Sequence, residues 1–178
     1  MLNSSDNSID LDAPSYDDSY AEERRKNILT SRHPISERME LYQCVTKGDL
    51  DALKALLETK KYSILEEVSK SGFYWTMFHY ASHYGRVDVL KYLIDKISNH
   101  PDKFDIFNLQ TVEGKTPLTC AILSGSLTLD QKKEIIKIWF ETFSVDIRLR
   151  KKTGEDILEL SQRNNLFEYV SEYCYRED

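Results

Sequence analysis

The sequence predicts an all-α fold in which helix-turn-helix units stack side by side into a solenoid. Three observations support this prediction. A large apolar residue marks each of four similar segments, at Leu41, Phe78, Leu118 and Leu158, with separations of 37, 40 and 40 residues. Within each segment the apolar residues recur with helical spacing. One segment alone has too little apolar surface to be stable, so a fixed period in this range indicates an array whose repeats contact their neighbours.

Residues 1–35 precede the array and are predicted to be an acidic, serine-rich tail. Residues 1–23 carry seven carboxylates and no lysine or arginine, and they have too few apolar side chains to offset the entropy of ordering. We therefore expect disorder in this part, and a solvated terminus is favoured over a regulatory segment. Residues 21–29 are expected to form a short helix, which the sequence His33-Pro34 ends.

The first two repeats follow from Ser36, where the helical spacing begins. Gly48 separates the two amphipathic segments of the first repeat. A loop over residues 59–72 then leads to the second repeat, in which a short N-capped helix within residues 74–84 is followed by Gly85 and a second amphipathic helix. The expected pattern in both repeats is a helix, a tight turn and a second helix.

The third and fourth repeats carry clearer signals for helix starts. Thr116 is a favourable N-cap, and Pro117 occupies the first helical position, where its missing N–H costs nothing. Asp156 takes the capping position in the fourth repeat, and a second short helix lies within residues 166–170. We predict one repeat domain over residues 36–178, with about four repeats of which the first and last are degenerate.

Composition excludes several classes of function. The 178 residues carry 24 basic and 30 acidic side chains; without the seven acidic residues of the tail, 30 − 7 = 23 acidic residues remain, so the repeat domain is nearly neutral and unlike a nucleic-acid binder. No apolar run reaches the roughly 18 residues of a membrane span. Three widely spaced cysteines, Cys44, Cys120 and Cys174, fit free thiols in a reducing compartment. We expect a cytoplasmic protein with no membrane insertion.

The repeats resemble the ankyrin repeat, whose pattern G-x-T-P-L-H-x-A-A-x-x-G is followed by a helix rich in valine and leucine. The third repeat carries the most matching residues, and the second keeps four; these are Gly114, Thr116, Pro117, Leu118, Ala121 and Gly125, and Thr76, His79, Ala81 and Gly85. Tyr74 and Met77 stand where the family has glycine and proline, and Thr119 stands where it has histidine. Two stretches exceed the family's length, at residues 99–108 and 126–131.

The resemblance implies a protein that binds a protein partner through its loop tips and the concave face of its leading helices. Carried over position by position, the partner-facing residues are Phe73, Trp75, His83 and Tyr84 in the second repeat, Lys115 and Leu123 in the third, and Lys152 and Arg163 in the fourth. Clustered exposed aromatic residues are typical of interface hot spots. Packing of the same rings as a local core beneath the preceding loop is an equally good interpretation.

The last loop carries a basic strip, made of Arg148, Arg150, Lys151 and Lys152. A solvated loop is favoured over a site for an acidic partner. The acidic tail of the same chain is a further possible contact for this strip, although salt weakens such an interaction beyond about 8 Å.

No enzyme, metal site or cofactor is predicted. His79 and His83 lie four residues apart, on one helix face, but Tyr80 stands where a zinc hydrolase has glutamate, and no third ligand is near. His79 is better explained by the ankyrin pattern, as a side chain hydrogen-bonded to loop backbone and to Thr76. Cys44 and Cys120 are expected in the core, whereas Cys174 lies near the chain end and is the more reactive candidate.

These observations favour a non-enzymatic protein–protein interaction module, a monomer or a subunit of a complex, that binds no nucleic acid. One alternative is a structural subunit of a larger assembly, with the tail and the two long loops threading between neighbours. A weaker alternative is an inhibitor that masks a transcription factor, although the tail lacks the Asp-Ser-Gly signal of such proteins. Fold alone does not identify the partner, because repeat folds bind many unrelated proteins.

Overall fold

A computed structural model describes residues 18–29, 33–60, 62–69, 73–142 and 145–176. Within these ranges it contains ten helices and no strand, which confirms the predicted all-α class. The helices are α1 (Asp18–Ile28), α2 (Ile35–Lys47), α3 (Leu50–Thr59), α4 (Met77–His83), α5 (Val87–Ile97), α6 (Lys103–Phe107), α7 (Pro117–Leu123), α8 (Leu129–Thr142), α9 (Ile157–Arg163) and α10 (Phe167–Cys174).

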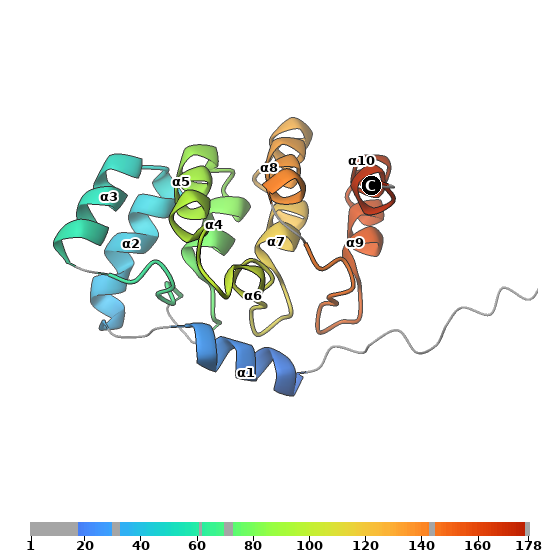
Figure 1. Ribbon diagram of the computed structural model, residues 1–178. Helices are drawn as coiled ribbons and strands as arrows, with labels where there is room; N and C mark the ends of the chain where they lie inside the picture. The colour runs from blue at the N-terminus through green and yellow to red at the C-terminus, as the bar shows by residue number, and fades with distance from the viewer. Residues whose placement is uncertain (1–17, 30–32, 61, 70–72, 143–144, 177–178) are drawn as a thin grey trace, which may run out of the picture.

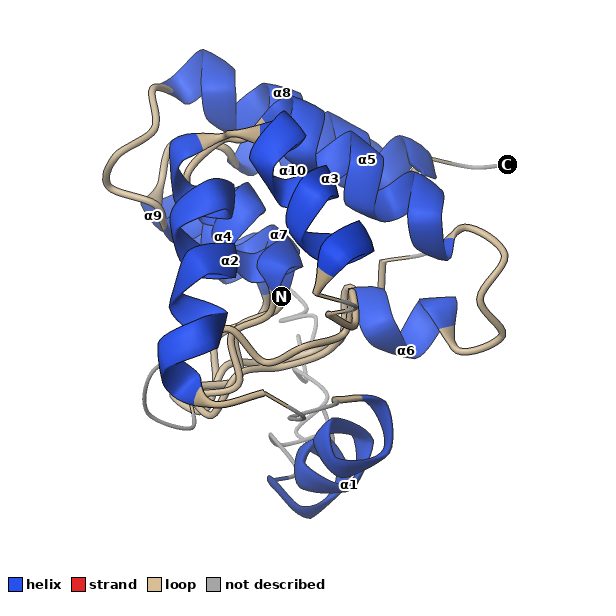
Figure 2. Ribbon diagram, turned by 90° about the vertical axis from the view of Figure 1, so that its left-hand side faces the viewer, coloured by secondary structure: helices blue, strands red, loops and turns tan. Residues whose placement is uncertain are grey.

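Eight of these helices form four pairs that stand side by side in chain order (Figure 1). Figure 2 shows that the leading helices α2, α4, α7 and α9 lie in one layer and α3, α5, α8 and α10 in another, with the loops of the repeats gathered on one side. Helix α4 packs against α2, α5 and α7, so the second repeat is central to the stack. This is the predicted solenoid of helix-turn-helix units.

The leading helices of the last three repeats begin at capping residues 40 positions apart. Thr76, Thr116 and Asp156 each precede the first helical residue in an extended conformation. The Thr116 hydroxyl accepts a hydrogen bond from the N–H of Thr119 at 3.2 Å, and the Asp156 carboxylate accepts one from the N–H of Glu159 at 2.9 Å. The predicted caps at residues 116 and 156 are confirmed, and each satisfies a backbone donor that the helix leaves without an internal partner.

The turns between paired helices use a left-handed residue seven positions after the apolar marker. Gly48 and Gly85 have φ values of 78° and 64°, and Asn165 takes the same role in the last repeat with a φ of 57°. Glycine and asparagine are the residues that adopt this conformation at least cost. The third repeat differs, because α7 ends at Leu123 and the extra residues 124–128 lead to α8 by a longer path.

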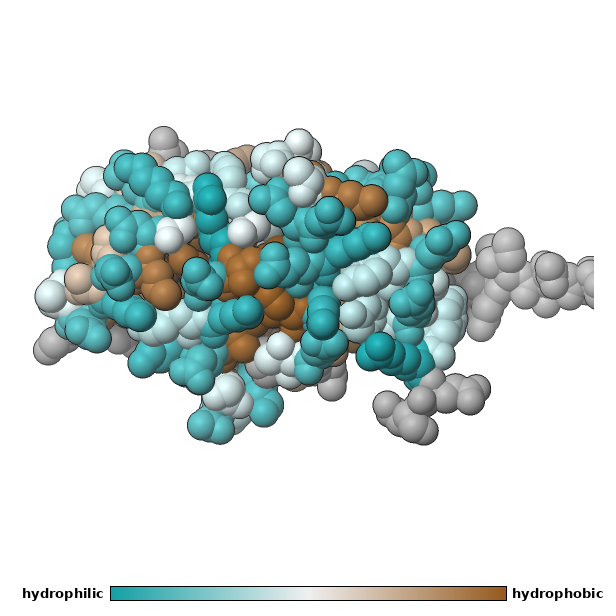
Figure 3. All heavy atoms as spheres, turned by 90° about the horizontal axis from the view of Figure 1, so that it is seen from above, coloured by the Kyte–Doolittle hydropathy of each residue, from teal (hydrophilic) through white to brown (hydrophobic). Residues whose placement is uncertain are grey.

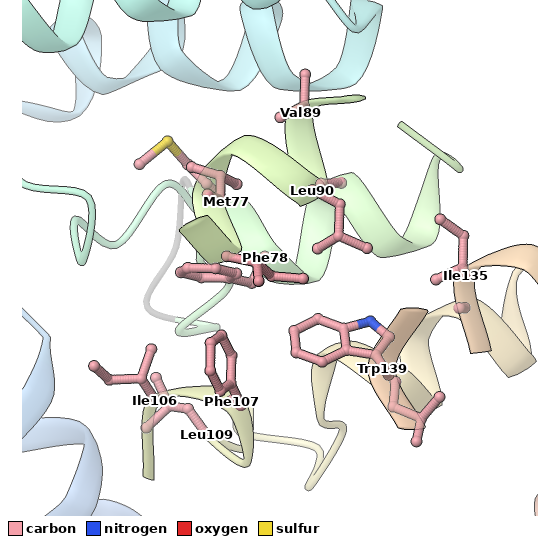
Figure 4. Packing of buried hydrophobic residues seen from close by; sticks show 14 of the residues in the cluster. Met77, Phe78, Val89, Leu90, Ile106, Phe107, Leu109, Ile135 and Trp139 are labelled. Carbon is pink, nitrogen blue, oxygen red and sulfur yellow. The ribbon is translucent and has the colours of Figure 1, made fainter. Parts of the chain in front are cut away.

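The core contains a group of aromatic rings at the centre of the stack (Figure 4). Phe78 of α4 meets Phe107 edge to face at 5.7 Å between ring centroids, and Phe107 meets Trp139 of α8 at 5.4 Å. All three side chains are buried. The Trp139 indole N–H donates to the Ser82 hydroxyl at 3.0 Å, so the one polar atom of the indole is also satisfied.

Helix α6 lies within residues 99–108, one of the two stretches that exceed the family's repeat length. Sequence reasoning did not predict a helix there. It is one and a half turns long, and its value to the fold is packing: Ile106 and Phe107 are buried, while Phe104 is exposed. The insertion therefore extends the core of the second repeat.

Helix α1 confirms the short helix expected at residues 21–29, although it begins three residues earlier. It lies across the loop side of the array, next to α6 (Figures 1 and 2). Disorder was expected over residues 1–23: residues 1–17 lie outside the described residues, and for residues 18–23 the expectation is wrong, because they form the first half of α1 and Ala21 is buried against the array. The domain boundary at residue 36 stays a prediction, and α1 packs closely against the domain beyond it.

The opposite side of the molecule, formed by the outer helices, carries a strip of apolar residues among polar ones (Figure 3). Two adjoining open hollows, of about 600 and 510 Å³, lie between α6 and the C-terminal parts of the outer helices α5, α8 and α10. Phe104, Phe140 and Tyr173 contribute to the first, and Ile94 and Ile138 to the second. The rings of Phe140 and Tyr173 stack with their centroids 4.9 Å apart, so each covers part of the other's apolar surface.

Candidate protein-binding surface

Five aromatic rings gather on the leading helices of the first two repeats and at the two ends of α4, and we call them the ring cluster: Tyr42, Trp75, Tyr80, His83 and Tyr84. Trp75 contacts Tyr80 at 4.8 Å and His83 at 5.6 Å between ring centroids. His83 meets Tyr84 edge to face at 4.9 Å. Tyr42 of α2 meets Tyr80 of α4 edge to face at 5.0 Å, so the cluster joins two repeats.

The ring cluster is neither core nor fully exposed. All five side chains are half-buried. The rings pack on one another, and part of each stays open to solvent. Rings held in this way lose little entropy on binding, because their neighbours already fix their rotamers.

Burial favours the neutral forms of His83 and Tyr80 within the cluster. Desolvation lowers the pKa of His83, and the nearby Lys115 charge adds to that effect, so the imidazole is uncharged. Burial likewise raises the pKa of Tyr80, and a hydrogen bond with Tyr84 raises that of Tyr42. The surface therefore offers ring faces, phenol hydroxyls and a neutral imidazole, which suit contacts with apolar or hydrogen-bonding side chains.

His79 holds the base of this surface in place. Its Nε2 lies 3.0 Å from the carbonyl oxygen of Leu109 and 3.2 Å from that of Lys115. Carbonyl oxygens accept, so Nε2 carries the proton and Nδ1 accepts from the N–H of Thr76 at 3.2 Å. The Thr76 hydroxyl oxygen lies 2.9 Å from the same Nδ1. This confirms the expected role of His79, as a link between a helix start and loop backbone.

The eight residues predicted to face a partner fall into separate places. Trp75, His83 and Tyr84 come together in the ring cluster. Phe73 lies just before it and is 47% exposed. Leu123 is half-buried, and its side chain packs against the core. The partner role of all eight positions stays a prediction.

The three charged residues among the eight are held by ion pairs. Lys115 pairs with Glu113, and Arg163 pairs with Glu155. Lys152 pairs with Asp18 of α1, 3.3 Å away. Lys152 lies at a loop tip and Arg163 at the end of α9, whereas Lys115 lies close enough to the ring cluster for its charge to act on His83.

Sequence reasoning missed Tyr42 and Tyr80. A signal for Tyr80 was present: it precedes Tyr84 by four residues, so the two lie on one face of α4. Tyr42 had no such signal, because its contact with Tyr80 crosses from one repeat to the next and depends on how the helices stack.

The basic strip of the last loop is neutralised by carboxylates. Arg148 pairs with Asp146 at 2.9 Å, and Lys151 pairs with Glu155 at 3.4 Å. Arg150 lies 3.2 Å from Asp156 and 3.4 Å from Glu159. The Lys152–Asp18 pair shows that the acidic segment before the repeats does reach this strip. Each basic side chain of the strip therefore has a carboxylate partner within the same chain, and its role toward an acidic partner stays a prediction.

Burial keeps the three thiols protonated at neutral pH, although Lys47 and Lys115 act against it at Cys44 and Cys120. Burial raises the pKa of Cys44 and Cys120, and that of Cys174 to about 11. At neutral pH these groups are thiols, and the thiolate is the reactive form, so Cys174 is less reactive than its place near the chain end indicated. Among the described residues, no group of three or more His, Cys, Asp or Glu side chains lies close enough to hold a metal ion.

Comparison with known proteins identifies the family. The family model for ankyrin repeats (3 copies) matches residues 41–138, which is more than half of the chain. This protein belongs to the ankyrin-repeat family, whose repeats are protein-interaction modules and whose members are generally not enzymes. No curated protein matches this chain in sequence.

A solved structure shares the fold. A chain of the crystal structure of the yeast ribosomal protein Rps3 in complex with its chaperone Yar1 matches with a TM-score of 0.64 and 24% sequence identity. The match covers 82% of this chain and 99% of that chain. At this level of identity the likeness shows the fold alone. In the described part of this chain, no helix has the length and apolar character needed to span a membrane.

Proposed function

We propose that this protein is a non-enzymatic binding module that holds a protein partner against the ring cluster on its leading helices. The observation that carries this proposal is the joining of five half-buried rings across two repeats, on the layer that the family uses for contacts. Large rigid rings bury much area at a small cost in entropy, and hot spots are rich in tryptophan and tyrosine.

The architecture supports a surface that is ready for binding before the partner arrives. His79 ties the start of α4 to the next loop, and Tyr80 contacts both Trp75 and Tyr42. A partner therefore meets rings whose positions are already fixed, which reduces the ordering cost of association. The neutral forms of His83, Tyr42 and Tyr80 favour apolar and hydrogen-bonding side chains of the partner over a cluster of charges.

The test begins with affinity capture from the native cell and mass spectrometry, which identify the partner. The wild-type protein and the double variant Trp75→Ala/Tyr84→Ala are then compared for capture of that partner. We expect the double variant to lose at least tenfold in affinity, because hot-spot truncations cost about 2 kcal/mol or more each. Unchanged capture by a folded double variant would contradict the proposal.

A matched control uses another exposed ring. Phe167 at the start of α10 is 43% exposed and lies outside the ring cluster, so Phe167→Ala should leave capture unchanged. Circular-dichroism melts of all variants separate binding from folding. Because the rings are half-buried, we expect the double variant to melt a few degrees lower and to stay folded at the temperature of the capture.

We infer that the protein acts in the cytoplasm as a monomer that joins its partner. Free thiols at Cys44, Cys120 and Cys174 fit a reducing compartment. Gel filtration distinguishes this from the alternative of a fixed subunit of a larger assembly. A well-behaved monomer supports the binding module, whereas aggregation of the isolated chain favours the assembly subunit.

A further inference from the structure

Helix α1 lies along the loop tips of the array (Figures 1 and 2). Within the described residues, this helix contacts α6 of the second repeat at one end and the loop tip of the last repeat at the other. Arg24 pairs with Asp105 of α6, and Asp18 pairs with Lys152 at the last tip. The tips of an ankyrin array are therefore already covered, by a segment of the same chain.

The centre of this contact is Arg25, whose side chain is only 4% exposed. Its Nη1 donates to the carbonyl oxygens of Gln110 and Thr111, both at 3.2 Å. The guanidinium lies over the Tyr74 ring, 4.9 Å from the centroid, and Nη2 lies 3.7 Å from the carboxylate of Asp18. Two carbonyls, a ring face and a carboxylate match the flat, multiply donating guanidinium, and they fit the single ammonium of lysine less well.

Tyr74 adds an independent observation. It has a φ of 59°, while Gly114 and Gly154 hold the corresponding positions 40 and 80 residues later with φ values of 75° and 93°. A left-handed conformation costs a non-glycine residue roughly 1–2 kcal/mol, so glycine would serve the turn better. The tyrosine contributes a ring beneath Arg25, a contact worth about 0.5–2 kcal/mol.

Helix α1 is attached by both apolar and polar contacts: Ile28 joins the hydrophobic core, and the rest of its buried face is alanine and arginine. Its buried residues are Ala21, Arg24, Arg25 and Ile28, so two of the four are arginines and one is a small alanine. A helix held by a hydrophobic seam would bury a stripe of large apolar residues instead. The loop tips therefore recognise α1 through its arginine pair, by side-chain-specific contacts.

We propose that the loop tips form a binding surface for a helix that carries two adjacent arginines, with α1 as the occupant that this chain supplies. A partner helix with the same pair of arginines binds at this surface in place of α1. The two guanidinium groups are bound at separate places. That of Arg25 contacts the Tyr74 ring and the carbonyls of Gln110 and Thr111, and that of Arg24 pairs with the Asp105 carboxylate. This inference does not depend on the ring cluster, which lies on the leading helices.

The experiment uses the full chain and a synthetic peptide with the sequence of residues 18–29 as the probe. The ¹⁵N-labelled double variant Arg24→Ala/Arg25→Ala keeps the loop tips but lacks the arginine pair in its own α1. Titration with the peptide should shift the amide resonances of Gln110, Thr111 and Lys152. The wild-type chain should show at least tenfold weaker binding, because a tethered occupant competes at an effective concentration in the millimolar range.

Two control peptides test the chemistry of recognition. A peptide with both arginines changed to alanine should bind at least tenfold more weakly than the parent, and a peptide with two lysines should fall between them. Equal binding of the three peptides, or equal binding to the wild-type chain and the double variant, overturns the proposal. Absence of peptide binding to a variant whose α1 has been released also overturns it.

Release of α1 is measured separately, by hydrogen exchange of its amides. The Arg24→Ala/Arg25→Ala variant should lose protection in α1 by at least tenfold, with the repeats unchanged. Tyr74→Gly gives a second, independent variant: it removes the ring and relieves the left-handed strain, so α1 should loosen while the array melts at the same temperature or higher. Full protection of α1 in both variants would show that the arginine contacts do not hold it.

Discussion

At the scale of single residues, His79 shows how a buried polar group is tied to stability. Its imidazole is buried, and both ring nitrogens form hydrogen bonds. Nδ1 accepts from the N–H of Thr76, and Nε2–H points at the carbonyls of Leu109 and Lys115. A proton on Nδ1 would remove the acceptor that Thr76 uses and place a charge in the core. Burial accordingly lowers the pKa of His79 from 6.5 to about 4.

This shift predicts a pH dependence of folding. Between pH 6.5 and about 4 the unfolded chain binds a proton at His79 that the folded chain does not. Stability therefore rises with pH in this window, and acidification from pH 7 to 4 removes roughly 3 kcal/mol of folding free energy through this residue. Urea unfolding at a series of pH values measures the slope.

The control for this prediction is His79→Thr, which copies the Thr116–Thr119 cap of the third repeat. This variant should be less stable than wild type at pH 7, because the carbonyls of Leu109 and Lys115 lose a donor. It should also lose the part of the slope between pH 6.5 and 4 that belongs to His79. An identical slope in the two proteins would show that other groups govern acid unfolding.

At the scale of elements, neighbouring loop tips pack backbone against backbone. The N–H of Lys152 donates to the carbonyl of Glu113 at 3.0 Å, and the Gln110 side-chain amide donates to the carbonyl of Arg150 at 2.9 Å. Gly114 lies at this contact: a Cβ there would come within 2.7 Å of the Lys152 nitrogen. The repeat glycine serves both the turn and the close approach of the next repeat.

Two glycine variants separate these roles. Gly114→Ala combines left-handed strain with a backbone clash, and we expect it to cost about 2–4 kcal/mol of folding free energy. Gly154→Ala has the strain but meets no atom within 4 Å, so about 1–2 kcal/mol is expected. Urea denaturation followed by circular dichroism compares them. Equal losses would show that the approach of the two tips contributes nothing beyond the strain.

Helix α6 gives a second prediction at this scale. Phe107→Ala should destabilise the protein by about 3–5 kcal/mol, because it removes a ring from between Phe78 and Trp139. Phe104→Ala, on the same short helix, removes a ring that is 44% exposed and should cost less than about 1 kcal/mol. Thermal melts of the two variants provide the measurement, and similar melting temperatures would contradict the packing role assigned to α6.

At the scale of the whole molecule, the helices at the centre of the array are packed on more sides than those at its C-terminal end. Helices α4 and α7 lie between repeats on both sides, and the rings of the core meet near them. Helix α10, at the end of the stack, buries Val170 alone among its fully described side chains. In a repeat array each unit depends on its neighbours, so an end unit has the fewest supports.

We therefore predict that α9 and α10 open before the rest of the protein. Native-state hydrogen exchange should give their amides protection lower than those of α4 and α7 by at least tenfold. Val170→Ala should lower protection in α9 and α10 and leave α4 unchanged. A uniform loss across all repeats would show instead that the array unfolds as one cooperative unit.

Much of this architecture could be predicted because it is local. The period of the apolar markers, the caps at Thr116 and Asp156 and the glycine turns each depend on a few consecutive residues. The role of His79 also followed from its place in the repeat pattern. Helix α6 could not be predicted in this way, because five residues carry too little periodicity to distinguish a helix from a loop.

The candidate site was predictable in part. Trp75, His83 and Tyr84 lie on one repeat and were found by position in the ankyrin pattern, whereas Tyr42 joins them through the stacking of α2 on α4. Arg25 lies on a helix outside the repeats and binds the carbonyls of Gln110 and Thr111, which follow it in the chain by 85 and 86 positions. Contacts of this kind have no signature in any single stretch of sequence.

The sequence by itself determined the ankyrin array, because stacking follows from a repeated amphipathic unit that cannot bury its own apolar face. Tertiary structure decided how much of each ring in the cluster stays exposed and what covers the loop tips. Both depend on distances between segments that are remote in the chain. The same reason explains why Asp18 and Lys152, 134 residues apart, meet on the surface where α1 closes over the repeats.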